Sequence, residues 1–205
     1  MLLNINVFAQ ELLPRMDSST EKYGYVDNQG QFVIAPQFEY ATRFADGYAV
    51  IREQGLFGYI DSIGNTIIEP RYYKVGGYSE GLFRVQQAEG EFWFFLNEKG
   101  QRAFKKSFYY VGNFHEGLAV FAEKDRRGET HFGYIGKNGK VVVKPVYAYA
   151  ADIKDGFGKI ALDLTSEAPR YGYVDAKGEV VVPCVYNDWM VENQLIEYKN
   201  RPKGE

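Results

Sequence analysis

The residues most able to do chemistry are acidic side chains that recur beside glycines. Asp27 and Asp46, and then Asp61 and Glu80, could form carboxylate pairs of the kind used in acid–base catalysis or calcium binding. Each of them, however, stands in a turn sequence that ends in glycine, where a carboxylate hydrogen-bonds the local backbone. The loops rich in oxygen ligands that calcium needs are missing from the sequence. We therefore expect these acids to be turn residues.

Other reactive groups are few. His115 and His131 have no second His or Cys at zinc-ligand spacing. The sequence contains no nucleophile elbow, no Walker loop and no dinucleotide-binding fingerprint. The single cysteine, Cys184, follows an apolar run in VVPCVY and is expected to be a buried structural thiol. The sequence thus predicts no catalytic residue, no metal and no cofactor, and an enzyme is the least favoured class.

The acidic turns belong to a repeated unit, and such internal repeats determine the architecture of a chain. The unit opens with an aromatic residue, Gly, a second aromatic residue, Val or Ile, and Asp. A further Gly follows three residues after the Asp. The copies of this opening segment are YGYVDNQG at 23–30, FGYIDSIG at 57–64, WFFLNEKG at 93–100, FGYIGKNG at 132–139 and YGYVDAKG at 171–178. The spacing between copies grows from 34 residues, between Gly24 and Gly58, to 39 residues, between Gly133 and Gly172.

Each copy predicts about three short strands and two glycine turns. The opening segment alternates and is rich in β-favouring residues, and its Gly is expected to pack against a neighbouring backbone or ring. After the turn comes a second strand, such as QRAF at Gln101–Phe104, which in most copies is expected to end at a Pro. An acidic residue and Gly then form a second turn before the third strand. In the fifth copy we place this third strand at Gln194–Tyr198.

These motifs resemble the WG-repeat family of bacterial proteins, also called KWG repeats. The signature of that family is an aromatic–Gly pair, an Asn/Asp-x-x-Gly turn, a Pro-x-aromatic and a later Phe-x-Glu-Gly-Leu. The resemblance covers Tyr23 to about Lys199 and implies repetitive β structure and an interaction role, with no catalytic residues to transfer. Tyr or Phe replaces the family's Trp in four copies. The third copy has Phe94, Asn97 and Lys106 in place of Gly, Asp and Pro.

The predicted fold is therefore all-β: a tandem array of five short three-stranded β units, stacked as an open twisted solenoid-like assembly. A closed propeller-like ring is the alternative, although the units are short for propeller blades, which have about 40–45 residues. A single repeat domain is expected over residues 23–205, after a leader at residues 1–22. We place the repeats at about 23–56, 57–92, 93–131, 132–170 and 171–199.

The leader leaves the compartment open. Met1–Gln10 is apolar and contains Val7-Phe8-Ala9, which suits signal peptidase and resembles the end of a signal peptide whose start lies upstream. The protein would then be exported to the periplasm or cell surface; otherwise it is cytoplasmic, and the segment is an ordinary N-terminal strand packed on the first repeat. No apolar run is long enough for a membrane span.

The repeat array favours a non-enzymatic protein-interaction or scaffolding module, because stacked repeats expose long repeated surfaces. The net charge of −3 provides no bulk positive field for nucleic acid. The third repeat and the loop after it nevertheless combine aromatic and basic residues, where a partner surface for an acidic segment or an anionic glycan is expected. Those residues are Trp93, Phe95, Lys105, Lys106, Arg126 and Arg127. Sequence drift in a tolerant repeat is the alternative interpretation of the third copy.

A narrower alternative is carbohydrate or cell-wall binding through a row of exposed rings. Repeated aromatic side chains on β-hairpins can stack on sugar faces if they reach solvent. The row consists of the second aromatic of each copy: Tyr25, Tyr59, Phe95, Tyr134 and Tyr173. The solvent exposure of this row therefore decides between the sugar-binding and the general interaction hypotheses.

Overall fold

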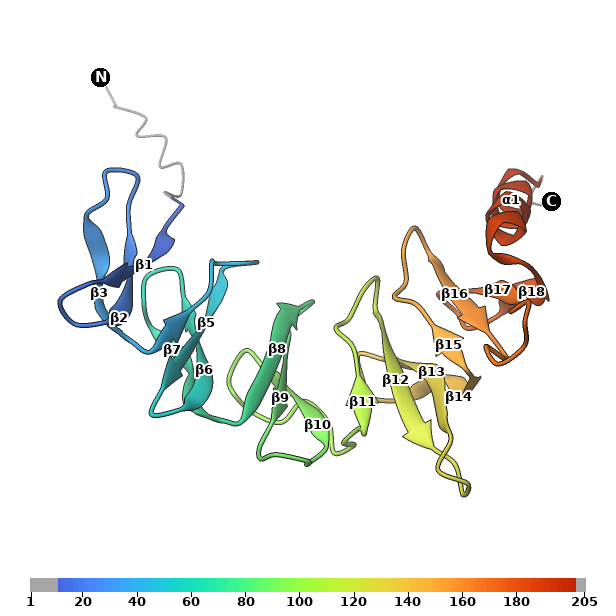
Figure 1. The fold of residues 1–205 in the computed structure, drawn as a ribbon, viewed down its shortest axis with the longest axis horizontal. Helices are drawn as coiled ribbons and strands as arrows, with labels where there is room; N and C mark the ends of the chain where they lie inside the picture. The colour runs from blue at the N-terminus through green and yellow to red at the C-terminus, as the bar shows by residue number, and fades with distance from the viewer. Residues whose placement is uncertain (1–10, 202–205) are drawn as a thin grey trace. The chain divides into compact units, whose positions relative to one another are not determined.

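The computed structural model describes residues 11–201 and divides the chain into two compact units. Unit 1 contains the chain up to residue 78 together with residues 83–90 and 96–101. Unit 2 contains residues 79–82, 91–95 and the chain from residue 102 onward. The described residues form eighteen strands and one helix, so the predicted all-β class is confirmed (Figure 1).

The strands form five small sheets with open strand orders. In unit 1 the first sheet has the order β1-β2-β3, with bounds Leu13–Asp17, Lys22–Val26 and Phe32–Phe38. The second sheet of unit 1 has the order β4-β5-β6-β7, with bounds Tyr40–Ala41, Tyr48–Glu53, Leu56–Asp61 and Thr66–Tyr72. The boundary between the units runs through the sheet β10-β9-β8, whose strands are β8 (Lys74–Ser79), β9 (Leu82–Gln86) and β10 (Trp93–Asn97).

Unit 2 contains two further four-stranded sheets. One has the order β11-β12-β13-β14, with bounds Tyr110–Val111, Leu118–Lys124, Thr130–Gly136 and Val141–Tyr147. The other has the order β15-β16-β17-β18, with bounds Tyr149–Ala150, Phe157–Ala161, Tyr171–Asp175 and Val180–Tyr186. All pairings in these two sheets are antiparallel.

Each four-stranded sheet joins two successive sequence repeats. In the second sheet, β5 ends the first repeat and the β6–β7 hairpin opens the second. The antiparallel pairing of β5 with β6 runs from Tyr48↔Asp61 to Glu53↔Leu56. The turn between them has positive φ at both central residues, 50° at Gln54 and 78° at Gly55, as a type I′ hairpin turn requires. The structural sheet is therefore offset from the sequence repeat by two strands.

The acidic residues of the opening segment are turn residues, as predicted. The Asp27 side-chain Oδ1 accepts hydrogen bonds from the backbone N–H groups of Gln29 and Gln31, each at 2.9 Å. Asp61 accepts two equivalent bonds in the second repeat. Asn97 does the same in the third, so the change from Asp to Asn keeps the turn.

The second acidic turn of the repeat is a two-residue hairpin turn. Asp46 has φ 50° and Gly47 has φ 85°, and Ala45 and Tyr48 exchange backbone hydrogen bonds of 2.9 and 3.0 Å around them. Both positive φ values fit a type I′ turn, which favours Asp or Asn before Gly. The same pair of positive φ values recurs in the next three repeats, at 80–81, 116–117 and 155–156.

Proline does not end the second strand, contrary to our expectation. β3 continues through Pro36 to Phe38, and its register with β2 shifts at a β-bulge. Because a bulge breaks the ladder, the N–H that proline lacks is not needed there. A Cβ added to Gly24 would lie 2.8 Å from the Ala35 carbonyl carbon and 2.8 Å from the Pro36 nitrogen. The repeated Gly and Pro thus allow two backbones to approach closely.

The third repeat departs from this arrangement because it has Phe94 at the glycine position. The strand predicted at Gln101–Phe104 does not form a regular strand in the described chain. β10 instead keeps an isolated bridge between Trp93 and Phe108, and the Arg102 guanidinium lies 4.3 Å from the Phe94 ring centroid. A ring at position 94 excludes the close backbone approach that the other repeats use.

The second aromatic of each copy lies in the core, not at the surface. The exposed fractions are 0% for Tyr25, 1% for Tyr59, 1% for Phe95, 0% for Tyr134 and 6% for Tyr173. The Tyr25 hydroxyl donates to the Thr42 carbonyl at 2.8 Å, and the Tyr134 hydroxyl donates to the Ala151 carbonyl at 2.6 Å. Burial raises the pKa of both hydroxyls above its ordinary value. The carbohydrate alternative therefore loses the ring row on which it was based.

The strand predicted at Gln194–Tyr198 is wrong, because this segment lies in the helix α1 (Asp188–Asn200). Asn187 caps the helix: its side-chain Oδ1 accepts a hydrogen bond from the Met190 N–H at 3.0 Å. Val191 and Leu195, four residues apart, lie on one face and are buried against the last hairpin. Figure 1 shows α1 beside β17 and β18, where a further strand would otherwise cover the core.

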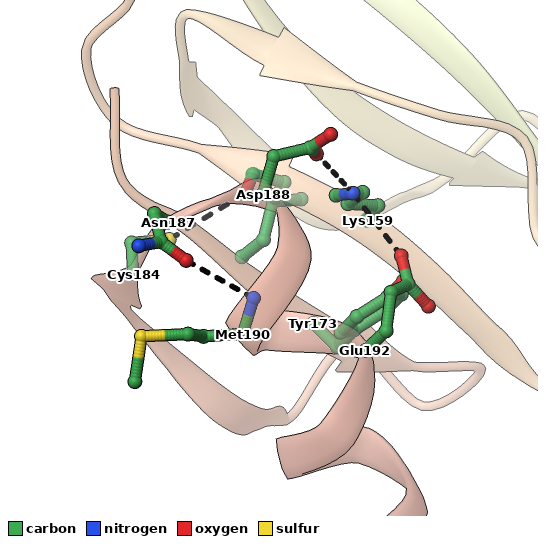
Figure 2. A network of polar contacts seen from close by, with 8 residues as sticks. Lys159, Tyr173, Cys184, Asn187, Asp188, Met190 and Glu192 are labelled. Carbon is green, nitrogen blue, oxygen red and sulfur yellow. Dashed lines mark hydrogen bonds and ion pairs between the residues drawn. The ribbon is translucent and has the colours of Figure 1, made fainter. Parts of the chain in front are cut away.

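Polar contacts attach the helix to the last sheet (Figure 2). The Lys159 Nζ lies 2.5 Å from Asp188 Oδ1 and 3.1 Å from Glu192 Oε1. The Tyr173 hydroxyl donates to Glu192 Oε1 at 2.7 Å, and this bond, together with Lys159, holds the pKa of the Glu192 carboxyl below its ordinary value. Nearby, the half-buried Cys184 thiol donates to a backbone carbonyl, and burial raises its pKa, as expected for a structural thiol.

The segment before the first repeat takes part in the first sheet. β1 pairs with β2 from Leu13↔Val26 to Asp17↔Lys22, so it occupies the place that a third strand takes in the later sheets. The tripeptide Val7–Ala9, which motivated the export hypothesis, lies outside the described residues. Within residues 11–201, no helix has both the length and the apolar character needed to cross a bilayer.

The fourth repeat offers a stabilising substitution, Gly136→Asp. Gly136 occupies the turn-acid position, and a Cβ there would make only ordinary contacts, 3.4 Å from Asn138 Oδ1 and 3.6 Å from Val142 Cγ2. We expect the free energy of unfolding to rise by about 0.5–1 kcal/mol, because the variant restricts the unfolded chain and its carboxylate can accept turn amides. Urea denaturation followed by circular dichroism measures this. Gly128→Ala, at φ 83°, is the control expected to destabilise, and a destabilised Gly136→Asp variant would contradict the turn argument.

Candidate functional site

The aromatic members of the predicted third-repeat surface belong to the core. Phe95 is 1% exposed, and its ring centroid lies 5.6 Å from that of Phe104 and 5.0 Å from that of Phe114. Trp93 is partly buried and packs against the same cluster. Phe95 therefore cannot contact a partner while the unit is folded, although the sequence pattern placed it in a candidate binding patch.

The basic members of that surface are in different environments. The Lys106 Nζ lies 2.9 Å from Glu123 Oε1 and 4.8 Å from the Phe121 ring centroid, so its charge already has a partner. Lys105 is exposed, in the segment before β11. The exposed residues Arg126–Arg127 lie instead in the turn between β12 and β13. The structure thus places the basic residues on two separate segments.

That same turn contains three groups that could in principle hold a cation. Ligand atoms of Asp125, Glu129 and His131 lie within 4.8 Å of one another, and the His131 Nε2 is 3.4 Å from Asp125 Oδ2. The Asp125 Oδ1, however, accepts hydrogen bonds from the N–H groups of Arg127 and Glu129 at 2.8 and 3.0 Å. The cluster is therefore explained by the repeated turn chemistry.

A groove in unit 1 brings together aromatic and basic residues of which the sequence pattern had indicated only Tyr59. It has a volume of about 620 Å³ and is lined by β4, β5, β6 and the first part of β8. We call it the unit 1 groove. Its aromatic lining residues are Tyr40, Tyr48, Phe57, Tyr59 and Tyr78, and its basic lining residues are Arg43, Arg52 and Lys74.

The fully buried Phe83 ring packs against three of the rings that line this groove. The Phe83 ring centroid lies 5.0 Å from that of Tyr48, 4.6 Å from that of Tyr59 and 4.9 Å from that of Tyr78. The Tyr59 hydroxyl donates to the Gly76 carbonyl, which ties β6 to β8. The lining is therefore preformed by packing, as is usual for binding sites.

The lining of the unit 1 groove has three basic side chains and, among the described residues, no acidic one, but carboxylates lie beside it: Glu11 Oε1 is 4.0 Å from the Arg43 guanidinium, and Glu98 accepts a hydrogen bond from the Tyr78 hydroxyl. The nearest carboxylate to Arg52 belongs to Glu39, at 3.4 Å. Glu39 also accepts hydrogen bonds from the N–H groups of Gln54 and Gly55; the Gly55 bond is the main cause that lowers the pKa of the Glu39 carboxyl. Because Glu39 is shared with the β5–β6 turn, it neutralises Arg52 only in part. Cations beside rings suit a ligand that has both carboxylate and apolar groups.

A second groove lies in unit 2 and has a volume of about 570 Å³. Three of its lining rings are exposed: Tyr109 by 48%, Tyr110 by 45% and Tyr149 by 38%. The Tyr110 ring meets the lining residue Phe132 edge-on at 6.0 Å, and the Lys124 Nζ lies 4.5 Å from the Tyr109 ring centroid. We call this the unit 2 groove. A recurrent Tyr two residues after the strand-ending aromatic was the sequence signal that could have predicted both grooves.

The comparison with protein families matches the chain over most of its length. The matching family is described as WG containing repeat. Its matches cover residues 23–56, 57–89, 93–125, 132–163 and 171–190. These segments begin at the same five residues as the copies of the repeated opening segment. No curated protein matches the chain at a significant level.

Solved structures give a likeness of fold. One, described as the crystal structure of the eukaryotic initiation factor, has a TM-score of 0.52 and 12% identity, covering 84% of this chain and 51% of that one. The chain therefore spans about half the length of that structure. A protein of unknown function from Bacteroides caccae has a TM-score of 0.34 and 15% identity, covering 89% of this chain and 79% of the other. At such identities the first likeness concerns the fold alone.

Proposed function

We propose that this chain, which belongs to the WG containing repeat family, is a non-enzymatic interaction module that binds an acidic segment of another protein. The observation that carries the proposal is the unit 1 groove, where three basic side chains, Arg43, Arg52 and Lys74, lie among exposed and partly exposed rings and no described lining residue is acidic. Arg and Tyr are the residue types that most often dominate binding energy at protein interfaces. Complementary charge then selects a partner segment rich in Asp or Glu.

The repeated polar residues support this proposal by serving structural roles. The carboxylate of Asp27 holds turn amides, and the hydroxyl of Tyr25 holds a backbone carbonyl. The residues that recur in most copies are thus used to build the fold, whereas the basic groove residues differ between copies: Ala122 and Tyr149 stand at the positions of Arg52 and Lys74. In a repeat array, such variable surface positions are the ones that create a binding face.

Two alternatives remain as outcomes of the test. An anionic glycan carries the same carboxylate charge, although the buried ring row no longer favours sugar stacking. The exposed residues Lys105, Arg126 and Arg127 of the third-repeat hypothesis offer equal positive charge at a different place. A matched pair of charge-reversal variants separates this place from the groove.

The experiment selects peptides from a random twelve-residue display library on the full chain and measures their affinity by calorimetry. We expect the selected peptides to combine Asp or Glu with large apolar residues, and their binding to weaken as salt rises. The triple variant Arg43→Glu, Arg52→Glu and Lys74→Glu should weaken binding by about tenfold or more. Circular dichroism checks that the variant remains folded.

The control variant carries Lys105→Glu, Arg126→Glu and Arg127→Glu, which changes the net charge by the same amount. Because long-range charge is matched, we expect it to weaken binding by about twofold at most. An equal loss in both variants, or a loss only in the control, would overturn the assignment to the unit 1 groove. Binding to polyanionic oligosaccharides with no selected peptide would favour the glycan instead.

A further inference from the structure

The unit 1 and unit 2 grooves are built from equivalent positions of the repeat. Each uses the exposed residue of one short strand, the opening aromatic of the next repeat, and a residue of the following short strand. The equivalent pairs are Tyr40 with Tyr110, Phe57 with Phe132, and Lys74 with Tyr149. Each unit therefore has one groove that is lined by the same three positions of the repeat.

The ring geometry of the two grooves also agrees. The Tyr40 ring meets Phe57 edge-on, with centroids 6.3 Å apart and an angle of 82°. The Tyr110 ring meets Phe132 in the same way, at 6.0 Å and 79°. Tyr40 is 43% exposed and Tyr110 is 45% exposed, so each presents a similar apolar area to a ligand.

The lining of the unit 1 groove has three basic side chains, whereas the described lining of the unit 2 groove has no charged side chain and only a neighbouring cation. In the unit 1 groove, the Arg52 guanidinium lies 5.8 Å from the Phe57 ring centroid. In the unit 2 groove, Ala122 stands at the position of Arg52, and the cation beside the groove is Lys124, which lies outside the lining and 4.5 Å from the Tyr109 ring centroid. None of the described residues lining the unit 2 groove is acidic. It therefore suits the same acidic and apolar ligand, with weaker electrostatic attraction.

We propose that the unit 2 groove is a second docking site for the same class of acidic segment, so that one chain holds two segments of one partner. This inference rests on the proposed function of the unit 1 groove. Holding two linked segments makes the second binding event intramolecular, which raises the overall affinity without any new contact. Equivalent grooves on successive parts of one array provide such paired sites.

The test titrates the full chain with a single peptide selected on it, and then with a tandem of two copies joined by a Gly/Ser linker of graded length. We expect two molecules of the single peptide to bind per chain, the second about three- to tenfold more weakly because of the missing cations. The double variant Tyr110→Ala and Lys124→Ala should remove the weaker site. For at least one linker length, the tandem should bind the native chain more tightly than it binds this variant.

The outcomes distinguish this inference from the proposed function. One peptide per chain, unaffected by the double variant, would overturn the second site and leave the unit 1 groove in place. If the native chain bound no peptide, both the second site and the proposed function of the unit 1 groove would be overturned. Val146→Ala, at a 51% exposed position of the same unit, is the control variant and should keep both sites. A loss of one site in this control would show a general effect on unit 2 and would overturn the assignment to the groove.

Discussion

Replacing Phe83 by alanine is expected to lower the free energy of unfolding of unit 1 by about 3–5 kcal/mol, the range typical of buried Phe-to-Ala changes. The Phe83 ring is completely buried beneath Tyr48, Tyr59 and Tyr78, at centroid distances of 4.6–5.0 Å. Removing the ring leaves a cavity under three side chains that line the unit 1 groove. Urea denaturation, followed by tyrosine fluorescence and circular dichroism, measures the loss.

The control for side-chain size is Phe92→Ala, which removes the same side chain at a position of unit 2 that is 56% exposed. Because little apolar area is buried there, we expect a change within about 0.5 kcal/mol. Three other repeats of this chain have a small residue at the position of Phe83: Ala49, Ala119 and Gly158. A loss below about 1 kcal/mol in Phe83→Ala would show that the three tyrosines repack, and our account of a preformed groove would be wrong.

The second large effect is expected from Gly133→Val in the fourth repeat. A Cβ at this position would lie 2.8 Å from the carbonyl carbon of Lys144 and 2.8 Å from the nitrogen of Pro145. Both atoms belong to the backbone, so relief requires the bulged strand to move away. We expect unfolding to become easier by about 1–3 kcal/mol, as in other overpacked sites.

Gly136→Val is the control, because it adds the same side chain to the same strand. There the added Cβ would find its nearest atoms at 3.4 Å and beyond, at ordinary van der Waals distance. We expect a change within about 0.5 kcal/mol at this position. Equal effects at 133 and 136 would mean that the cost comes from β-strand propensity and not from the close approach of two backbones.

The sequence predicted those parts of the fold that depend on local chemistry. Asp27 and Asp46 lie in the expected turns, because turn hydrogen bonds and positive φ are set by neighbouring residues. Gly24 packs against the backbone of the neighbouring strand, as predicted, because a glycine inside a strand usually marks the close approach of another backbone. The extent of the second strand was not predicted, since the bulge that accommodates Pro36 depends on the partner strand.

Two other errors had a common cause, the assumption that every copy repeats the same plan. The helix α1 was missed because the repeat pattern led us to expect a strand, although Asn187 followed by an apolar pair at Val191 and Leu195 is typical of a capped helix. We predicted Phe95 at a partner surface because Phe94 breaks the motif beside it. Phe95 is nevertheless buried, like the second aromatic of every other copy. The two grooves were missed because each combines residues of two successive repeats.

The offset between sheet and sequence repeat determines where the chain can be divided for protein engineering. A cut between copies, at residues 56–57, falls after the first residue of β6 and breaks the pairing from Tyr48↔Asp61 to Arg52↔Phe57. A cut at Glu39, between β3 and β4, leaves the first sheet intact and starts the next fragment at Tyr40. The contiguous unit of strand pairing is therefore the four-stranded sheet from Tyr40 to Tyr72, and a design that exchanges it must also match the core that Ile51 and Ile60 share with the first sheet.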